Sequence, residues 1–238
     1  MKKIVMTGLL GLSSLVLHAG NMGPASTNMR TVPYIAGEGS YSWNTLNGFT
    51  INSNPPSVTD NGWGGRLSVG IDRPYTPMFS LNAEAGGGYY GSTNMNTPGS
   101  GVTSTVHITG YDILAGGTYH LPYFDVFGDF GFMVQTLLST MTRNNGERFP
   151  GGVFAGTTTG HASQTQVLPE LKVGAAYNYQ TNLSLTLAYM YAFGSDVSGN
   201  IISTAVDPAQ ASINSAGSIN LRNPSLSTIL FGLRYKFA

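Results

Sequence analysis

Hydrophobic and polar residues alternate with a period of two along most of the chain, from Pro33 almost to the C-terminus. In the segment Leu183–Phe193, one face carries leucine and aromatic residues, while the other carries mainly serine, threonine and alanine. A period of two predicts a β-strand whose two faces meet different environments. We predict eight such strands: Tyr34–Trp43, Trp63–Asp72, Met78–Tyr90, Val106–Tyr119, Phe124–Gln135, Val167–Tyr179, Leu183–Phe193 and Ser227–Phe237.

The connections between these strands alternate between long and short. The short ones are Arg73–Pro77, His120–Tyr123 and Gln180–Asn182, and the long ones are Asn44–Gly62, Gly91–Thr105, Thr136–Gln166 and Gly194–Leu226. In an up-and-down barrel, this alternation places both chain ends and all short turns at one end, and four long loops at the other. We therefore predict an all-β fold, an eight-stranded antiparallel up-and-down transmembrane β-barrel. Ten strands stay possible, because either of the last two loops has room for another hairpin.

The positions of the aromatic residues indicate which face of each strand points outward. In a soluble barrel or sandwich, the apolar face would be enclosed and the charged face would meet water. Here the apolar face carries aromatic residues toward both strand ends, with mostly Leu, Val, Ile and Ala between them. Two aromatic girdles around an aliphatic belt are typical of a surface that spans a lipid bilayer. We therefore expect the apolar face, including Leu67 and Leu187, to contact lipid.

The composition supports a membrane protein built from strands. Only 9% of the 238 residues are charged, against roughly 25% in an average soluble protein. Hydrophobic residues make up 41%, yet only the N-terminus approaches the stretch of about 20 apolar residues that a transmembrane helix needs. Eleven basic and eleven acidic residues cancel, which argues against nucleic-acid binding. The absence of cysteine excludes disulfides and thiolate metal sites.

The N-terminus has the layout of a secretory signal peptide. Lys2 and Lys3 precede an apolar stretch, Ile4–Leu17, and Leu17-His18-Ala19 offers a small-residue cleavage site. We predict a signal peptide at residues 1–19, a periplasmic N-terminal segment at 20–32 and the barrel with four extracellular loops at 33–238. An inner-membrane anchor is the alternative, which the shortness of the apolar stretch disfavours. Removal of residues 1–19 would leave nine basic and eleven acidic residues.

Eight charged residues fall on the faces that we expect to be enclosed: Glu38, Arg66, Glu84, Asp112, Asp129, Glu170, Lys172 and Arg234. An eight-stranded barrel is about filled by its own side chains, and an isolated buried ion costs several kcal/mol. We therefore expect ion pairs that close the lumen, among Glu38, Arg66 and Glu84 on successive strands and between Asp129 and Lys172. These pairs would serve packing alone or would form a gate to a narrow conductance.

The last predicted strand carries outward Phe231, Leu233, Tyr235 and Phe237 between small or basic inward residues. Together with the signal peptide, this strand resembles the C-terminal insertion signal of bacterial outer-membrane barrels, although Ala238 follows the phenylalanine that is usually final. The whole body resembles the small eight-stranded outer-membrane proteins, the OmpA transmembrane domain and the opacity-type surface antigens. The resemblance implies the outer membrane of a Gram-negative bacterium, contact with lipid and lipopolysaccharide, and the outer-membrane assembly machinery as a partner. It also implies surface exposure and adhesion rather than an enzyme.

Other chemistry is sparse. Some outer-membrane enzymes that modify lipids use a His-x-Ser pair, which His161-Ala162-Ser163 matches, but we place this triplet in a Gly/Thr-rich loop and expect no catalysis. We expect no metal and no cofactor. The run Gly86-Gly87-Gly88 lies within a predicted strand, where it would relieve crowding beside a large neighbour. The first hypothesis is therefore a structural surface protein or adhesin that binds host or phage ligands through its loops. A narrow porin-like channel is the alternative, and a lipid-modifying enzyme comes third.

Overall fold

In the computed structural model, residues 30–47, 58–97, 102–145, 148–149, 152–153, 156–194, 197–207 and 210–237 are described. The predicted signal peptide, most of the segment 20–32, and Ala238 lie outside these residues. The strands are β1 (Val32–Asn47), β2 (Val58–Thr76), β3 (Phe79–Thr97), β4 (Val102–His120), β5 (Phe124–Asn145), β6 (Arg148–Phe149), β7 (Gly152–Val153), β8 (Gly156–Asn178), β9 (Leu183–Ala192), β10 (Val197–Asp207) and β11 (Gln210–Lys236). In the part of the chain that is described, no helix is long and apolar enough to cross a membrane.

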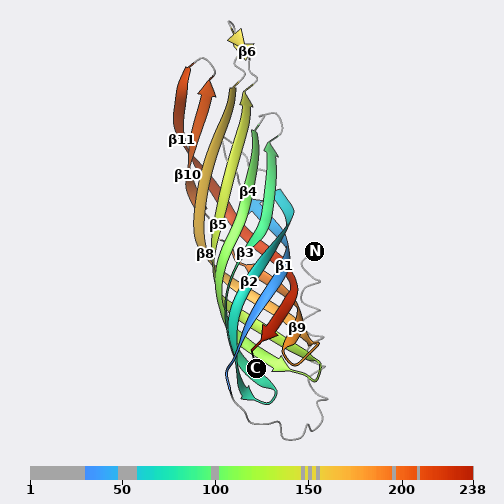
Figure 1. The fold of residues 1–238 in the computed structure, drawn as a ribbon. Coiled ribbons are helices and arrows are strands. Elements are labelled where there is room, and N and C mark those ends of the chain that lie inside the picture. The colour runs from blue at the N-terminus through green and yellow to red at the C-terminus, as the bar shows by residue number, and fades with distance from the viewer. Residues whose placement is uncertain are drawn as a thin grey trace, which may run out of the picture.

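The strands form a closed antiparallel barrel with eight positions around its wall. Each of β1 to β5 pairs with its neighbour in sequence, β5 pairs with β8, and β11 pairs with β1 to close the ring (Figure 1). The position between β8 and β11 is shared, because β9 pairs with both strands at one level and β10 pairs with both farther along. Strands β6 and β7 form a separate hairpin. The prediction of eight antiparallel up-and-down strands is thus confirmed.

The two ends of the barrel differ as the alternation of connections predicts. Residues 77–78, 121–123 and 179–182 make short turns at one end, which we call the turn end, where β1 begins and β11 finishes. At the opposite end, the loop end, the strands run farther than the sequence pattern indicates. Much of the segments predicted as long loops continues as paired strand, including the hairpins of β5 with β8 and of β10 with β11. These hairpins project from the barrel in Figure 1.

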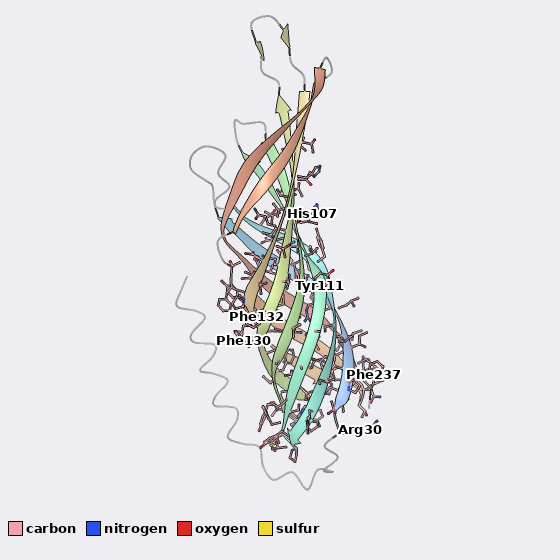
Figure 2. The ribbon with its side chains drawn as sticks, turned by 90° about the vertical axis from the view of Figure 1, so that its left-hand side faces the viewer. Arg30, His107, Tyr111, Phe130, Phe132 and Phe237 are labelled. Atoms are coloured by element: carbon pink, nitrogen blue, oxygen red, sulfur yellow. The ribbon has the colours of Figure 1, made fainter. Side chains whose placement is uncertain are left out.

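The alternation of side chains follows the orientation predicted for a membrane barrel. Leu67 and Leu187 are 69% and 60% exposed on the outer wall, whereas Glu38 and Arg66 are 5% and 1% exposed inside. Figure 2 shows outward side chains along the wall, with His107 toward the loop end, Tyr111, Phe130 and Phe132 at mid-height, and Phe237 near the turn end. A large apolar outer surface around a charged interior suits a lipid bilayer and would be costly in water.

A break in the seventh strand position coincides with a proline on its neighbour. The amide of Phe193 donates to the carbonyl oxygen of Pro169 at 2.9 Å, but Pro169 has no N–H to return the bond. The seventh position of the wall, formed by β9 and then β10, ends its first part at Ala192. Ala192 pairs with Glu170 on β8, and Ile202 pairs with His161. Between these two pairs there are ten steps along the β9–β10 segment but only nine along β8. One extra residue relative to β8 is therefore accommodated between Ala192 and Ile202, as in a β-bulge.

Candidate functional site

The eight predicted interior charges lie together inside the barrel, and we call them the central charge cluster. Each of the eight is at most 5% exposed. Arg66, on β2, is the hub of the cluster. Its Nη1 lies 2.7 Å from Glu38 Oε2, its Nη2 lies 2.7 Å from Glu84 Oε1, and its Nε donates to Asp112 Oδ2 at 2.9 Å. One guanidinium thus joins carboxylates from β1, β3 and β4, which ties four neighbouring strands together.

Lys172 bridges the lumen instead of pairing with its neighbour on the adjoining strand. Its Nζ lies 2.8 Å from Glu84 Oε1 and 3.3 Å from Glu38 Oε1. Asp129 is its partner in the β5–β8 ladder, but the two side chains form no ion pair, so the expected Asp129–Lys172 pair is wrong. The long side chain of lysine reaches the centre of the barrel, where two carboxylates converge, and the shorter Asp129 accepts a hydrogen bond from Asn82 Nδ2 at 2.8 Å.

Arg234, on β11, contacts the cluster mainly through aromatic rings. Its guanidinium carbon lies 4.6 Å from the ring centroid of Tyr34 and 4.9 Å from that of Phe127, while its Nη2 is 3.9 Å from Glu84 Oε2. The Tyr34 hydroxyl donates to Glu84 Oε2 at 2.9 Å. Cation–π contacts of this kind strengthen when the cation is removed from water. Glu84 therefore receives bonds from β1, β2 and β8 and is the most fully satisfied acid of the cluster.

Gly86 makes room for the Arg66 side chain. A Cβ on Gly86 would overlap the guanidinium of Arg66, which three carboxylates hold in place. The expectation that the glycine run relieves crowding beside a large neighbour is therefore confirmed at this position.

We predict that Gly86→Ala lowers the free energy of unfolding by about 1–3 kcal/mol, because overpacking displaces Arg66 from its carboxylates. Urea titration of the barrel refolded in lipid vesicles measures this loss. Gly128→Ala is the matched control: its Cβ would meet nothing nearer than Val173 Cγ1 at 4.0 Å, so its stability should be unchanged or slightly higher. Equal effects of the two substitutions would contradict the packing argument.

A second, apolar layer fills the interior and was not predicted from the sequence. On β3, β4, β5, β8, β9 and β11, hydrophobic and mostly large side chains point inward on the loop-end side of the charges, interspersed with buried polar residues such as Gln135, Gln166 and Thr228. We call the buried set the upper apolar cluster: Tyr90, Val106, Ile108, Met133, Leu137, Leu168, Met190, Ala192, Leu226 and Leu230. Each is at most 2% exposed. Because hydrophobic residues occur on both faces of these strands at this level, the period of two weakens there. The described residues therefore close the lumen twice, with charges and with a mainly hydrophobic layer.

A hydrogen-bonded chain of polar residues closes the turn end. Ser80 Oγ lies 2.8 Å from His120 Nε2, and His120 Nδ1 lies 2.9 Å from Asp125 Oδ1. Lys236 Nζ lies 3.4 Å from Asp125 Oδ2 and 3.5 Å from Asp72 Oδ2. These groups lie on five different strands, so their bonds link those strands at the rim of the barrel. Ser80 is distant from His120 along the chain, whereas Asp125 follows His120 by five residues, across the turn at residues 121–123.

The order of Ser80, His120 and Asp125 is that of a hydrolase triad, but the surroundings do not suit catalysis. A pocket of about 540 Å³ adjoins these hydrogen-bonded residues, and it is lined by His120, Asp125 and Lys236, but not by Ser80. Ser80 is completely buried, so a substrate in this pocket would not reach its hydroxyl. A nucleophile must contact the group it attacks. We therefore assign these bonds to closure of the barrel end.

The His-x-Ser triplet lies on β8 rather than in a loop, which corrects the placement made from the sequence. His161 and Ser163 are both exposed, and His161 Nδ1 lies 3.4 Å from Thr140 Oγ1. No hydrogen bond between described residues joins this histidine to Ser163 or to an acid. The described residues contain no group of three or more His, Asp or Glu placed to hold a metal ion.

The residues of the predicted insertion signal lie on or just beyond the last strand and point outward. Phe231, Leu233, Tyr235 and Phe237 are between 43% and 55% exposed. The aromatic residues predicted for the two girdles are likewise exposed or half-buried on the outer wall. The exterior thus offers lipid an apolar surface on β11 from Ile229 to Tyr235, which Phe237 continues.

Comparisons with known proteins agree with this architecture. No known protein family and no curated protein matches the sequence. Among solved structures, a major outer membrane protein from Thermus thermophilus is 16% identical with a TM-score of 0.52, over 84% of this chain and 99% of that chain. The chain has the fold of an outer-membrane β-barrel. The predicted resemblance to outer-membrane barrels is thereby confirmed at the level of the fold.

Two further solved structures also align with the chain. Neisserial surface protein A is 11% identical with a TM-score of 0.45, over 86% of this chain and 97% of that chain. The attachment invasion locus protein Ail of Yersinia pestis is 10% identical with a TM-score of 0.41, over 86% of this chain and 98% of that chain.

Proposed function

We propose that this chain is an outer-membrane surface protein whose barrel is a closed support and whose loop-end hairpins bind ligands outside the cell. One observation carries the proposal: the strands are far longer than a bilayer requires. A transmembrane strand needs about 9–11 residues, whereas β5 and β8 have 22 and 23. On β5 the outward residues are mainly apolar as far as Leu138, with Thr136 as an exception, and are threonine at Thr140 and Thr142, so the rest of that strand lies beyond the apolar belt.

The projecting strands form one continuous sheet. Above the barrel, β8 pairs with β5 on one edge and with β10 on the other, and β10 pairs in turn with β11. Paired backbone holds this sheet in a defined shape, which lowers the entropic cost of binding compared with free loops. A rigid surface outside the membrane suits adhesion to a host or phage surface. Lipid, lipopolysaccharide and the assembly machinery are the partners that we propose for the wall and for the last strand.

A closed interior supports this proposal over the alternative of a porin-like channel. The central charge cluster and the upper apolar cluster each fill the lumen among the described residues. A channel would need both layers to move. A lipid-modifying enzyme has less support still, because the His161 ring bonds to Thr140 and not to Ser163.

Shortening the two hairpins tests the proposal. Replacing Arg143–Thr158 or Gly199–Ile219 with Asn-Gly joins residues that already face each other across the ladder, so the strand register is preserved. We expect both variants to fold into heat-modifiable barrels, and at least one to lose adhesion of displaying cells to an epithelial monolayer. An Asn-Gly insertion in the turn at residues 179–182 is the control that should keep adhesion. Adhesion retained by both shortened variants, or absent in the wild type, would contradict the proposal.

A further inference from the structure

Glu170 differs from the other acids of the central charge cluster, because the barrel gives it no counter-charge. Its side chain is completely buried, and neither carboxylate oxygen accepts a hydrogen bond from a described residue. Arg66 and Lys172 contact other carboxylates, and no base lies within 4.0 Å of Glu170 in the described part of the chain. Packing alone does not explain why a buried carboxyl group lacks hydrogen-bond partners for both of its oxygens.

The charge balance of the cluster points the same way. Its eight residues comprise five acids and three bases, so full ionisation would leave two uncompensated negative charges inside the barrel. The charged groups that act on Glu170 come from four strands. Asp112 on β4 and Glu84 on β3 carry the same charge that an ionised Glu170 would carry, whereas Arg66 on β2 and Lys172 on β8 carry the opposite charge. Both bases are already engaged by other acids, which weakens their effect on Glu170.

The position of Glu170 also removes it from water. Its ladder partners are Gly131 on β5 and Ala192 on β9, neither of which can bond a carboxylate through a side chain. The inward residue next to it on β8 toward the loop end is Leu168, a member of the upper apolar cluster. Glu170 thus lies at the boundary between the charged and the apolar layers. An ionised carboxylate without partners is strongly disfavoured in such a site, whereas a neutral one is tolerated.

We infer that Glu170 is a proton-binding site, held in its neutral form at neutral pH inside the folded barrel. The proton supplies the missing positive charge. A metal ion suits the site less well, because hard cations need about six oxygen ligands and the described residues contain no group of three or more His, Asp or Glu placed to hold one. This site is independent of the proposed function of the hairpins. Loss of the proton at alkaline pH would place a new negative charge directly beneath the upper apolar cluster.

Infrared spectroscopy of the refolded wild-type barrel in lipid vesicles tests the inference directly. A protonated carboxyl group has a carbonyl stretching band that a carboxylate lacks. We expect this band at neutral pH, its shift when the glutamates carry ¹³C in the side-chain carboxyl, and its loss at alkaline pH. Of the other three glutamates, Glu38 and Glu84 are ion-paired and Glu147 lies outside the described residues. Absence of a ¹³C-sensitive band at neutral pH would overturn the inference, without any variant having to fold.

A matched pair of variants assigns the proton to its residue. Glu170→Gln should remove the band and leave the unfolding midpoint in urea unchanged at neutral pH. Because the folded wild type binds one proton more than the unfolded chain, its midpoint should fall as the pH rises, while that of Glu170→Gln should not. Glu84→Gln, which weakens an acceptor of Arg66, Lys172 and Tyr34, should keep the band and lower the midpoint. A band retained in Glu170→Gln, or a wild-type midpoint that rises with sodium or potassium concentration, would overturn the inference.

Discussion

Arg66→Ala should destabilise the barrel more than any other single change in its interior. The substitution leaves Glu38, Glu84 and Asp112 without their shared cation in a site that water does not reach. Removing one partner of a buried ion pair costs about 3–5 kcal/mol, because the remaining charge stays buried and uncompensated. We expect a loss of this size in the free energy of unfolding, measured by urea titration in vesicles and by the heat-modifiable shift on gels.

Two further substitutions make the Arg66 result specific. Arg73→Ala removes the same residue type from the same strand at an exposed position, and should change stability by no more than about 0.5 kcal/mol. Arg66→Lys keeps the charge but loses the planar fork that reaches three carboxylates, so an intermediate loss is expected. If Arg66→Ala and Arg73→Ala unfold at the same urea concentration, the cluster does not hold the strands together.

The same variant separates a closed barrel from a gated channel. In planar lipid bilayers, we expect wild type, Glu38→Ala and Arg66→Ala to conduct no ions, because the upper apolar cluster still closes the lumen on the loop-end side of the charges. A hydrophobic constriction resists the passage of ions even where its diameter would admit water. Conductance that appears in Glu38→Ala or Arg66→Ala would instead favour the gate, and with it the channel.

Sequence patterning predicts the wall of this barrel better than its contents. The outward faces follow from the period of two, since lipid demands an apolar side chain at every second position. The interior charges also follow, because a charged residue on such a strand has only one tolerable side. The upper apolar cluster cannot be recognised in this way, because hydrophobic residues such as Met133 and Leu168 suit either an outward or an inward position. Their inward side becomes visible only when the strands are closed into a ring.

Long-range partners are the other part that sequence patterning misses. Ladder neighbours can be predicted from strand order, and Asp129 does face Lys172 in the register. The amine of Lys172 nevertheless contacts Glu38 and Glu84 across the lumen, because side-chain length, rather than strand order, determines which groups meet at the centre. At the rim, His120 does bond its ladder partner Asp125, whereas Ser80 bonds His120 rather than its own ladder partner Thr118.

Leu187→Arg should cause the largest loss on the outer wall. Leu187 lies in the middle of β9 with Ala175 and Phe231 as its ladder partners, and its side chain is 60% exposed. An arginine that faces lipid near the bilayer midplane costs a barrel about 2–4 kcal/mol, and the cost falls toward the interfaces. Thr181→Arg, in an exposed turn, is the control and should cost little. Equal urea stability of the two variants in vesicles would show that water, not lipid, surrounds β9.

A label at the same two positions gives an answer that does not depend on stability. The chain has no cysteine, so Leu187→Cys and Thr181→Cys each provide a single site for an environment-sensitive fluorophore. On refolding in vesicles, the dye at position 187 should shift to blue emission and be quenched by brominated acyl chains, while the dye at 181 should keep the emission it has in water. The urea stability of Leu187→Arg and the emission of the dye at position 187 depend on the same property, because the hydrocarbon that destabilises a charge there also shifts the emission of the dye. If the dye at position 187 emits in the blue but Leu187→Arg lowers the free energy of unfolding only slightly, the arginine side chain reaches the membrane interface. That result would place Leu187 near an edge of the apolar belt rather than at its centre.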